Sequence, residues 1–272
     1  MKLSPKLVLA KDFIQFYFRA RTIYQIDSPL IFSFCNEVLD NATLVKTPIT
    51  NHYRDQCLKD NTSFSRSKIN EKSRMSNDSK LVVKNIAKTA SSSHYKYKRI
   101  VSLAKWNNCR RILELGTNLG FTALALAENG FEVDSVEGDK NTFSYVSKKM
   151  NHSNLNLHFS EFKEFLHSCT KKYDLIFIDG DHNYESTLSL VKKSKNLLNP
   201  NGLIIIDDIR WSSDMKRAWR SIAENAHWNL CLDLFLLGIV GKRETTHSKI
   251  SLALLPKKFR PWPYYFFRRG IK

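Results

Sequence analysis

The sequence predicts an α/β fold built on a doubly wound, mostly parallel sheet. The first observation is that short apolar runs alternate with helix-like segments from residue 81 onward. Helices of this length connect parallel strands and cover both faces of the sheet. The second observation is the abrupt end of the apolar run 175–178 at two carboxylates and an imidazole. Ligands bind at the carboxyl ends of such strands, so the polar residues there are candidate site residues.

The N-terminal part is predicted to be helical. Residues 7–18 form an aromatic, apolar segment, and Ser28-Pro29 begins a second helix that extends to Leu39, with proline in its first turn. We expect these helices to pack in the core or at an interface, and a membrane-surface role is the alternative. Residues 58–80 are polar and poor in large apolar side chains, which is typical of a linker or a mobile loop.

Five strands and five helices are predicted in alternation. The strands are Arg111–Leu115, Glu132–Glu137, Leu155–Phe159, Tyr173–Ile178 and Leu203–Ile206. The helices are 118–129, 140–151, 161–171, 184–198 and 212–226. Two more apolar runs, Leu230–Val240 and Lys249–Leu255, predict an antiparallel pair at the edge of a seven-stranded sheet. The expected domains are a helical extension with linker over 1–80, the α/β domain over 81–256 and a basic aromatic tail over 257–272.

The first predicted strand ends at a glycine-rich turn. Glu114, Gly116 and Gly120 give the pattern E-x-G-x-x-x-G where the strand passes into a helix. Glycines there let the backbone approach a ligand closely. The turn lacks the G-x-G-x-x-G pattern that cradles a dinucleotide pyrophosphate, which disfavours a nicotinamide-dependent dehydrogenase.

Polar residues also follow the second and third predicted strands. Glu137 ends the second strand, about 20 residues past the turn, where an acid accepts hydrogen bonds from ribose hydroxyls. A surface carboxylate is the alternative for Glu137. Ser160 follows the third strand and suits the N-cap of the next helix. The alternative is that Ser160 or Phe162 lies beside an adenine.

Three aspartates follow the fourth and fifth predicted strands. Adjacent parallel strands bring Asp179, Asp207 and Asp208 together, and carboxylates at one point repel each other unless a cation lies among them. Oxygen ligands favour Mg²⁺, Ca²⁺ or Mn²⁺. The alternative is that one acid caps the following helix and another pairs with Arg210 or a nearby lysine.

The net charge of +17 is unevenly distributed. Residues 1–110 hold 20 basic and 8 acidic side chains, residues 111–240 hold 14 and 17, and residues 241–272 hold 9 and 1. Basic flanks suit an anionic partner such as nucleic acid or phospholipid. A solvated surface is the alternative, because no nucleic-acid-binding motif accompanies the charge.

A cytoplasmic location is expected. The five cysteines are scattered without a metal-binding or redox spacing, so reduced thiols are the default. The N-terminus does not resemble a signal peptide, because Lys11-Asp12 interrupts a short apolar stretch. No run reaches the roughly 18 apolar residues that span a bilayer.

Four segments, in this order and spacing, resemble the class I S-adenosylmethionine-dependent methyltransferases: ILELGTNLG, VEGDK, FIDGDHNYE and IIIDDIRW. The resemblance covers about residues 85–256. It is to bacterial members related to the cation-dependent O-methyltransferases that act on catechol and caffeoyl-CoA. It implies a Rossmann-like fold and S-adenosyl-L-methionine as the cofactor.

The resemblance assigns roles by position. It implies the cofactor-binding residues Glu114, Gly116, Thr117, Asn118, Gly120, Glu137, Ser160 and Asp179. It also implies Mg²⁺ or another divalent cation on Asp179, Asp207 and Asp208, although the family usually has Asn at the last position. Family members carry a lysine three residues after the first of these aspartates, where it deprotonates the acceptor. His182 stands there in this sequence and would act as general base with Asp179. A structural histidine bonded to Asp181 is the alternative.

The acceptor is expected to be a hydroxyl oxygen of a small molecule or glycan. Methyltransferases that act on amino groups of bases commonly carry Asn/Asp-Pro-Pro-aromatic after the fourth strand, and Asp179-Gly180-Asp181-His182 has no proline. Added N-terminal helices often cap the acceptor site in this superfamily, which predicts that role for Phe13–Leu39. Trp211 is the candidate for lining the acceptor pocket, and Trp219 for packing its helix on the sheet.

Several alternatives stay open at this point. A methyltransferase could modify RNA through the basic flanks, or could work without a metal while the aspartates serve structure. A non-catalytic protein of the same fold could bind a partner through those flanks. The tail 260–269 mixes aromatic residues with arginines, which suits docking or a homodimer contact, with peripheral membrane or nucleic-acid contact as the alternatives.

Overall fold

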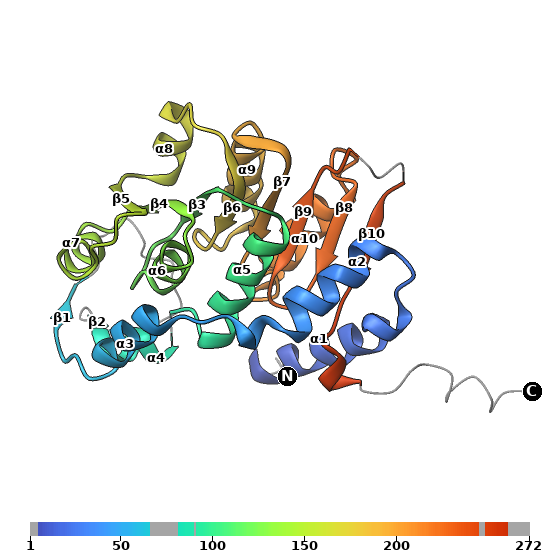
Figure 1. Ribbon diagram of the computed structural model, residues 1–272, viewed down its shortest axis with the longest axis horizontal. Helices are drawn as coiled ribbons and strands as arrows, with labels where there is room; N and C mark the ends of the chain where they lie inside the picture. Colours follow the sequence, from blue (N-terminus) through green and yellow to red (C-terminus); the bar gives the residue numbers. More distant parts are fainter. Residues whose placement is uncertain (1–4, 66–80, 90, 245–247, 261–272) are drawn as a thin grey trace, which may run out of the picture.

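The computed structural model describes residues 5–65, 81–89, 91–244 and 248–260. Its main sheet has eight strands in the order β10-β8-β9-β7-β6-β3-β4-β5 (Figure 1). The strands are β3 (Arg111–Leu115), β4 (Glu132–Glu137), β5 (Leu155–Phe159), β6 (Tyr173–Ile178), β7 (Leu198–Ile206), β8 (Leu230–Asp233), β9 (Gly238–Gly241) and β10 (Ile250–Ala253). The predicted α/β, mostly parallel fold is confirmed.

The predicted strand bounds agree with the structure at β3, β4, β5 and β6. The strand β7 begins at Leu198, five residues before the predicted start. The sequence Asn199-Pro200-Asn201-Gly202 has the composition of a turn. Pairing with β6 nevertheless begins at Tyr173 and Leu198, and its register shifts before Leu203.

The edge of the sheet differs from the prediction. The run 230–240 folds back on itself, and β8 pairs antiparallel with β9. The turn between them is closed by a hydrogen bond of 2.8 Å from the Leu234 N–H to the Leu237 carbonyl oxygen. The strand β10 then lies parallel to the free side of β8, so an antiparallel pair between 230–240 and 249–255 is wrong. One predicted strand became two, which gives eight strands instead of seven.

Helices cover both faces of the sheet. The helices after residue 81 are α4 (Val83–Thr89), α5 (His94–Trp106), α6 (Phe121–Glu128), α7 (Lys140–Lys149), α8 (Phe162–Ser168), α9 (Tyr184–Lys195) and α10 (Ser213–Glu224). Side chains of α5, α6 and α7 join one buried apolar cluster, and side chains of α8, α9 and α10 join another. Successive strand residues such as Ile112 and Leu113 enter opposite clusters, as the period of two requires.

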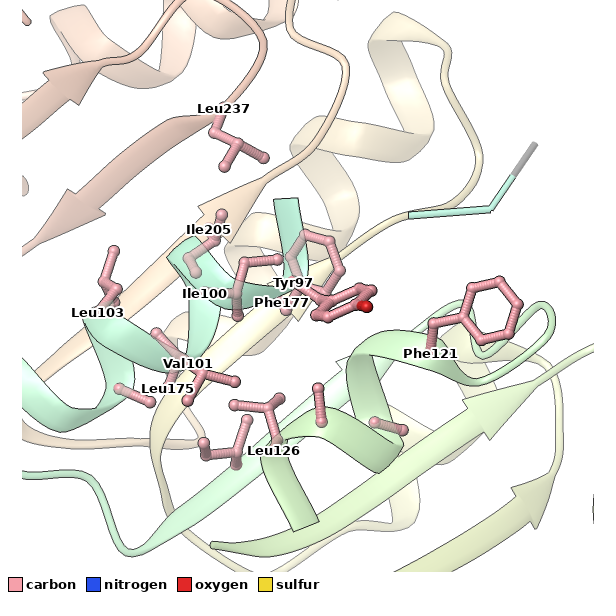
Figure 2. Packing of buried hydrophobic residues seen from close by; sticks show 14 of the residues in the cluster. Tyr97, Ile100, Val101, Leu103, Phe121, Leu126, Leu175, Phe177, Ile205 and Leu237 are labelled. Carbon is pink, nitrogen blue, oxygen red and sulfur yellow. The ribbon is translucent and has the colours of Figure 1, made fainter. Parts of the chain in front are cut away.

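The face covered by α5 brings helix and strand side chains into close packing. Figure 2 shows Tyr97, Ile100 and Val101 of α5 beside Phe177 of β6 and Ile205 of β7. All five side chains are fully buried. Burying a side chain of this kind contributes about 1.5–3 kcal/mol, so α5 is firmly held against the centre of the sheet.

The N-terminal part is helical, as predicted. It contains α1 (Pro5–Arg19), η1 (Ile23–Gln25), α2 (Pro29–Phe34), the π-helix η2 (Cys35–Asp40), η3 (Ala42–Leu44) and α3 (Pro48–Cys57). Ile31, Phe34 and Val38 are fully buried and belong to the cluster that also contains α5. The predicted domain boundaries remain a prediction, but these helices share a core with the sheet.

Two predicted segments fall largely on residues that the structure does not describe. Of the predicted linker 58–80, residues 66–80 lie outside the described ranges, and on either side of them β1 (Ser63–Phe64) pairs with β2 (Leu81–Val82). Of the tail, residues 261–272 lie outside, and η5 (Lys257–Phe259) precedes them. Among the described residues, no helix combines the length and the apolar character that crossing a membrane requires.

The first helix is joined to the last strands. The Arg21 N–H donates to the Ala253 carbonyl oxygen at 2.8 Å, and the Leu255 N–H donates to the Arg21 carbonyl oxygen at 2.8 Å. An ion pair of 2.8 Å joins Lys216 of α10 to Asp12 of α1. Residues from the two ends of the chain therefore form one edge of the molecule, with α1 near β10 in Figure 1.

Candidate functional site

The turn after β3 is packed against the end of β6. Gly116 has a φ of +111°, and an added Cβ would lie 2.1 Å from the Asp179 carbonyl oxygen. The Asp179 N–H donates to the Leu115 carbonyl oxygen at 2.8 Å. Gly120 has a φ of +75°, and an added Cβ would lie 2.3 Å from the Met150 sulfur. Both positions favour glycine because of their positive φ, and at Gly116 the backbone of Asp179 also leaves no room for a Cβ.

A buried acid lies under this turn. Glu114 is 1% exposed, and its Oε2 accepts a hydrogen bond of 2.6 Å from the Ser135 hydroxyl. That hydroxyl lies 2.7 Å from the Thr117 hydroxyl. Burial raises the pKa of Glu114 to about 8, against the Ser135 hydrogen bond, and the charge of Glu137 adds to the rise. A cationic group of a ligand would favour the ionised carboxylate.

Glu137 holds two neighbouring backbone segments at the end of β4. Its Oε2 accepts from the Asn118 N–H at 2.8 Å, and its Oε1 accepts from the Asp139 N–H at 2.9 Å. Asn118 has a left-handed φ of 50°. Each carboxylate oxygen has two lone pairs, so Glu137 can accept further hydrogen bonds. Its chemistry and its position at the strand end fit ribose hydroxyls, which remains a prediction.

A small polar pocket lies over the turn after β3. It is lined by Ser91, Ser92, Glu114, residues 116–122 and Asp179. The pocket therefore brings together the residues predicted for the methionine part of the cofactor. Its enclosed volume of about 10 Å³ is the space of about one water, so it must widen to admit a ligand. Ser91 and Ser92 were not predicted, because a serine run before a helix carries no other signal.

The turn after β5 differs from the N-cap expectation. Glu161 is the N-cap of α8 and makes no side-chain capping bond. The Ser160 hydroxyl donates to the Glu161 carbonyl oxygen at 3.1 Å, so the capping role of Ser160 is wrong. Phe162 packs over Gly180, where an added Cβ would lie 2.5 Å from the ring. A position of Ser160 or Phe162 beside an adenine remains a prediction.

The aspartates after β6 and β7 meet a lysine. The Asp207 N–H donates to the Ile178 carbonyl oxygen at 2.9 Å, which holds the two strand ends together. Lys96, in the first turn of α5, forms an ion pair with Asp207. The side chain of Asp207 is fully buried, and that of Lys96 is 23% exposed. A cation supplied by the chain therefore lies at the predicted carboxylate cluster.

The charges of this cluster act strongly on one another. Burial and the charge of Asp207 raise the pKa of Asp179 well above its usual range, and they also raise the pKa of Asp208. Burial would lower the pKa of Lys96, but the three carboxylates outweigh it and hold that pKa above its usual range. The charged, ammonium form of Lys96 is therefore favoured.

The residues in this arrangement do not fit a divalent cation. Within the described ranges, no group of three or more His, Cys, Asp or Glu side chains is placed to hold a metal ion. The Lys96 ammonium contacts Oδ2 of Asp207, one of the predicted metal ligands, and would repel a second cation. A metal on Asp179, Asp207 and Asp208 remains a prediction, and this arrangement gives it no support. The alternative pairing with a nearby lysine is what the structure contains.

Neither of the other roles considered for the aspartates is found. Ser212 is the N-cap of α10 and accepts from the Met215 N–H. Arg210 is engaged with Asp233 through two contacts, Nη1 to Oδ1 at 2.8 Å and Nη2 to Oδ2 at 2.6 Å. The lysine is the partner that sequence reasoning missed. The sequence did contain one indication of this lysine. Lys96 lies in the first turn of a helix, where a positive charge opposes the helix dipole, and no acid in that turn offsets it.

His182 lies beside Asp179. Its Nε2 is 3.7 Å from Asp179 Oδ1, which is ion-pair range and longer than a hydrogen bond. Oδ2 of Asp181 accepts from the Ser186 hydroxyl at 2.8 Å, which is a different partner from the predicted one. The His182 side chain is 29% exposed, so a ligand can reach the imidazole.

The two tryptophans after β7 differ as predicted in their exposure. Trp219 is 9% exposed and packs on Gly238 of β9. Trp211 is 46% exposed, and its backbone N–H donates to the Asp208 carbonyl oxygen at 2.8 Å. Trp211 is therefore an open aromatic side chain next to the carboxylate cluster. Its role in an acceptor pocket remains a prediction.

The comparisons with known proteins agree with this geometry. Residues 113–209 match a family model described as a methyltransferase domain. These residues resemble a methyltransferase domain, which confirms the predicted resemblance to methyltransferases. A search of curated protein sequences gave no match.

Solved structures share the fold of this methyltransferase. One is a proposed caffeoyl-CoA O-methyltransferase from Staphylococcus aureus, with 17% identity, a TM-score of 0.52, and coverage of 58% of this chain and 88% of that one. Another is the SAH-bound methyltransferase PaMTH1 from Podospora anserina, with 15% identity, a TM-score of 0.51, and coverage of 90% and 99%. At such identities the likeness establishes the fold alone.

Proposed function

We propose that this methyltransferase transfers a methyl group from S-adenosylmethionine to a hydroxyl oxygen of a small molecule. The observation that carries the proposal is the juxtaposition of the Gly116 turn, Glu114 and Glu137 at the ends of β3 and β4. These groups match a ligand that carries an ammonium at one end and ribose hydroxyls nearer its middle. A glycan hydroxyl remains the alternative acceptor.

The oxygen acceptor is inferred from the residues after β6. Asp179, Gly180, Asp181 and His182 supply carboxylates and an imidazole without the proline-rich motif of base-directed enzymes. The two solved structures described above include one proposed O-methyltransferase. An imidazole beside a carboxylate can accept a proton from a hydroxyl, because the carboxylate stabilises the imidazolium.

Different residues of this chain would bind the methyl donor and take the acceptor proton. When bound, S-adenosylmethionine supplies a sulfonium-activated methyl group, whose carbon–sulfur bond breaks with the electron pair left on sulfur. Glu114 would bind the methionine part of the donor, and Glu137 would bind its ribose hydroxyls. His182 would take the hydroxyl proton as the new carbon–oxygen bond forms. Alignment is then the main contribution of the protein.

The first experiment is thermal stabilisation by S-adenosylhomocysteine, with NAD as the control ligand. We expect stabilisation of wild type by the homocysteine compound and none by NAD. Glu137→Ala should lose most of that stabilisation while Glu132→Ala, an exposed acid on the same strand, should keep it. Stabilisation by NAD, or by neither compound, would remove the methyltransferase proposal.

The acceptor side is tested with His182→Ala. We expect this variant to keep its affinity for S-adenosylhomocysteine and to lose about 10²–10⁴ in turnover, the usual contribution of a general base. The measurement is single-turnover methyl transfer to a panel of phenols and alcohols, with glycan acceptors included. Unchanged turnover in His182→Ala would exclude His182 from the mechanism.

A further inference from the structure

We propose that the Lys96 ammonium takes the place of a divalent cation and holds the acceptor oxygen, so that methyl transfer needs no metal. This proposal rests on the proposed function and names a residue that it did not include.

The position of Lys96 is fixed by the packing of α5. Tyr97 and Ile100, on the same helix, are fully buried against the sheet, and Figure 2 shows both pointing toward the strands β6 and β7. The Tyr97 hydroxyl also donates to Asn51 Oδ1 at 2.8 Å. Lys96 reaches the end of β7 from this helix, so its ammonium is positioned in advance of any ligand.

The charges around Lys96 match those that would otherwise require a metal. Asp179, Asp207 and Asp208 all act on Lys96, and Asp207 contacts it directly. A lysine in the first turn of α5 lies at the positive end of the helix dipole, which is unfavourable. No acid in that turn offsets its charge. The nearby carboxylates offset both that cost and the cost of burying the ammonium, which explains a lysine at this helix end.

An ammonium can supply part of the chemistry of a metal ion. It has three N–H donors, and the contact with Asp207 uses one. The others can donate to an acceptor oxygen, whose negative charge grows as it loses its proton to His182. The oxygen–methyl bond forms, the sulfur–methyl bond breaks with its electron pair on sulfur, and Lys96 keeps its proton throughout.

The test is a Mn²⁺ titration, followed by electron paramagnetic resonance, with S-adenosylhomocysteine present. Wild type should bind no Mn²⁺ at this site. Lys96→Met, which leaves three carboxylates without their ammonium, should gain one Mn²⁺ with at least about tenfold higher affinity. Lys98→Met is the matched control on the same helix, because Lys98 donates to the exposed Thr43 carbonyl oxygen at 3.3 Å, away from the aspartates, and it should behave as wild type.

A stoichiometric Mn²⁺ site in wild type would overturn the proposal, and this measurement needs no variant to fold. A folded Lys96→Met that gains no Mn²⁺ would also overturn it. Lys96→Arg keeps the charge and should stay free of Mn²⁺. Binding of S-adenosylhomocysteine, measured on the same samples, tests the proposed function separately, because the Mn²⁺ result does not depend on it.

Once an acceptor substrate has been identified, the metal dependence of turnover can be measured. Wild-type turnover should be unchanged by EDTA, and Lys96→Met should lose turnover but keep S-adenosylhomocysteine affinity. Turnover that EDTA abolishes, and Mg²⁺ restores, in wild type would contradict a metal-free mechanism.

Discussion

The two halves of the site are built in different ways. At the ends of β3 and β4, the backbone forms the site through Gly116, Gly120 and the N–H groups bound by Glu137. At the ends of β6 and β7, side chains form it, and one of them, Lys96, comes from 111 residues before its partner Asp207. The first half depends on local conformation, whereas the second depends on tertiary packing.

The largest effect is expected at Gly116. Gly116→Ala places a Cβ 2.1 Å from the Asp179 carbonyl oxygen at a φ of +111°, which should lower the free energy of unfolding by more than about 3 kcal/mol. Gly130→Ala is the control, because it has a φ of +91° but no atom within 4 Å. It should cost only about 1–2 kcal/mol. Equal losses in chemical denaturation would show that the backbone contact is unimportant.

Lys96→Met should have the next largest effect. It leaves the buried Asp207 without its ammonium, which should cost about 2–4 kcal/mol of unfolding free energy. Lys216→Met breaks the more exposed pair with Asp12 and should cost no more than about 1 kcal/mol. Urea unfolding of both variants makes the comparison, and a smaller loss for Lys96→Met than for Lys216→Met would contradict it.

Glu114 should make the stability of the ligand-free protein fall as the pH rises. Its folded pKa of about 8 lies above the ordinary glutamate pKa of about 4.5. The protonated form is therefore favoured by folding, and this stability is present below pH 4.5 and lost as the pH approaches 8. The slope should be at most about 1.4 kcal/mol per pH unit. Glu114→Gln should remove this component in unfolding measured from pH 5 to 8, and an unchanged slope would argue against a raised pKa.

The smallest effect on stability is expected at Trp211. Its ring is 46% exposed, so Trp211→Ala should change the unfolding free energy by less than about 0.5 kcal/mol. Turnover with an acceptor should nevertheless fall while S-adenosylhomocysteine affinity stays unchanged. Trp219→Ala is the contrasting variant, because the buried ring should cost about 3–5 kcal/mol. Unchanged acceptor kinetics in Trp211→Ala would exclude Trp211 from the pocket.

The sequence was sufficient for the half of the site that local conformation forms. Apolar runs and glycine spacing located β3, β4 and the Gly116 turn, because strand patterns and positive φ leave local signals. The convergence of Asp179 and Asp207 followed from the rule that parallel strand ends lie together. The sequence did not reveal Lys96 as a cation at these aspartates, since the pairing of Lys96 with Asp207 depends on how α5 packs on the sheet.

The prediction for the edge of the sheet was wrong for a related reason. The run 230–240 contains enough apolar residues for one long strand, and its turn at Leu234–Leu237 has no glycine or proline at its centre. Phe235 takes the left-handed φ of 74° instead. Its N–H donates to Asp233 Oδ1 at 3.0 Å, and its ring packs on Phe13 and Phe16 of α1. A helix distant in the sequence therefore stabilises a turn that the local sequence does not predict.

The joining of α1 to the last strands sets the order in which the protein can be completed. Arg21 forms its backbone bonds with Ala253 and Leu255, which leave the ribosome more than 230 residues later. During synthesis, Arg21 has no partner for these bonds until β10 and the residues after it have been made. Nascent chains that stop before β10 should keep their N-terminal helix accessible to chaperones and proteases, and the native edge should close only after β10 has left the ribosome.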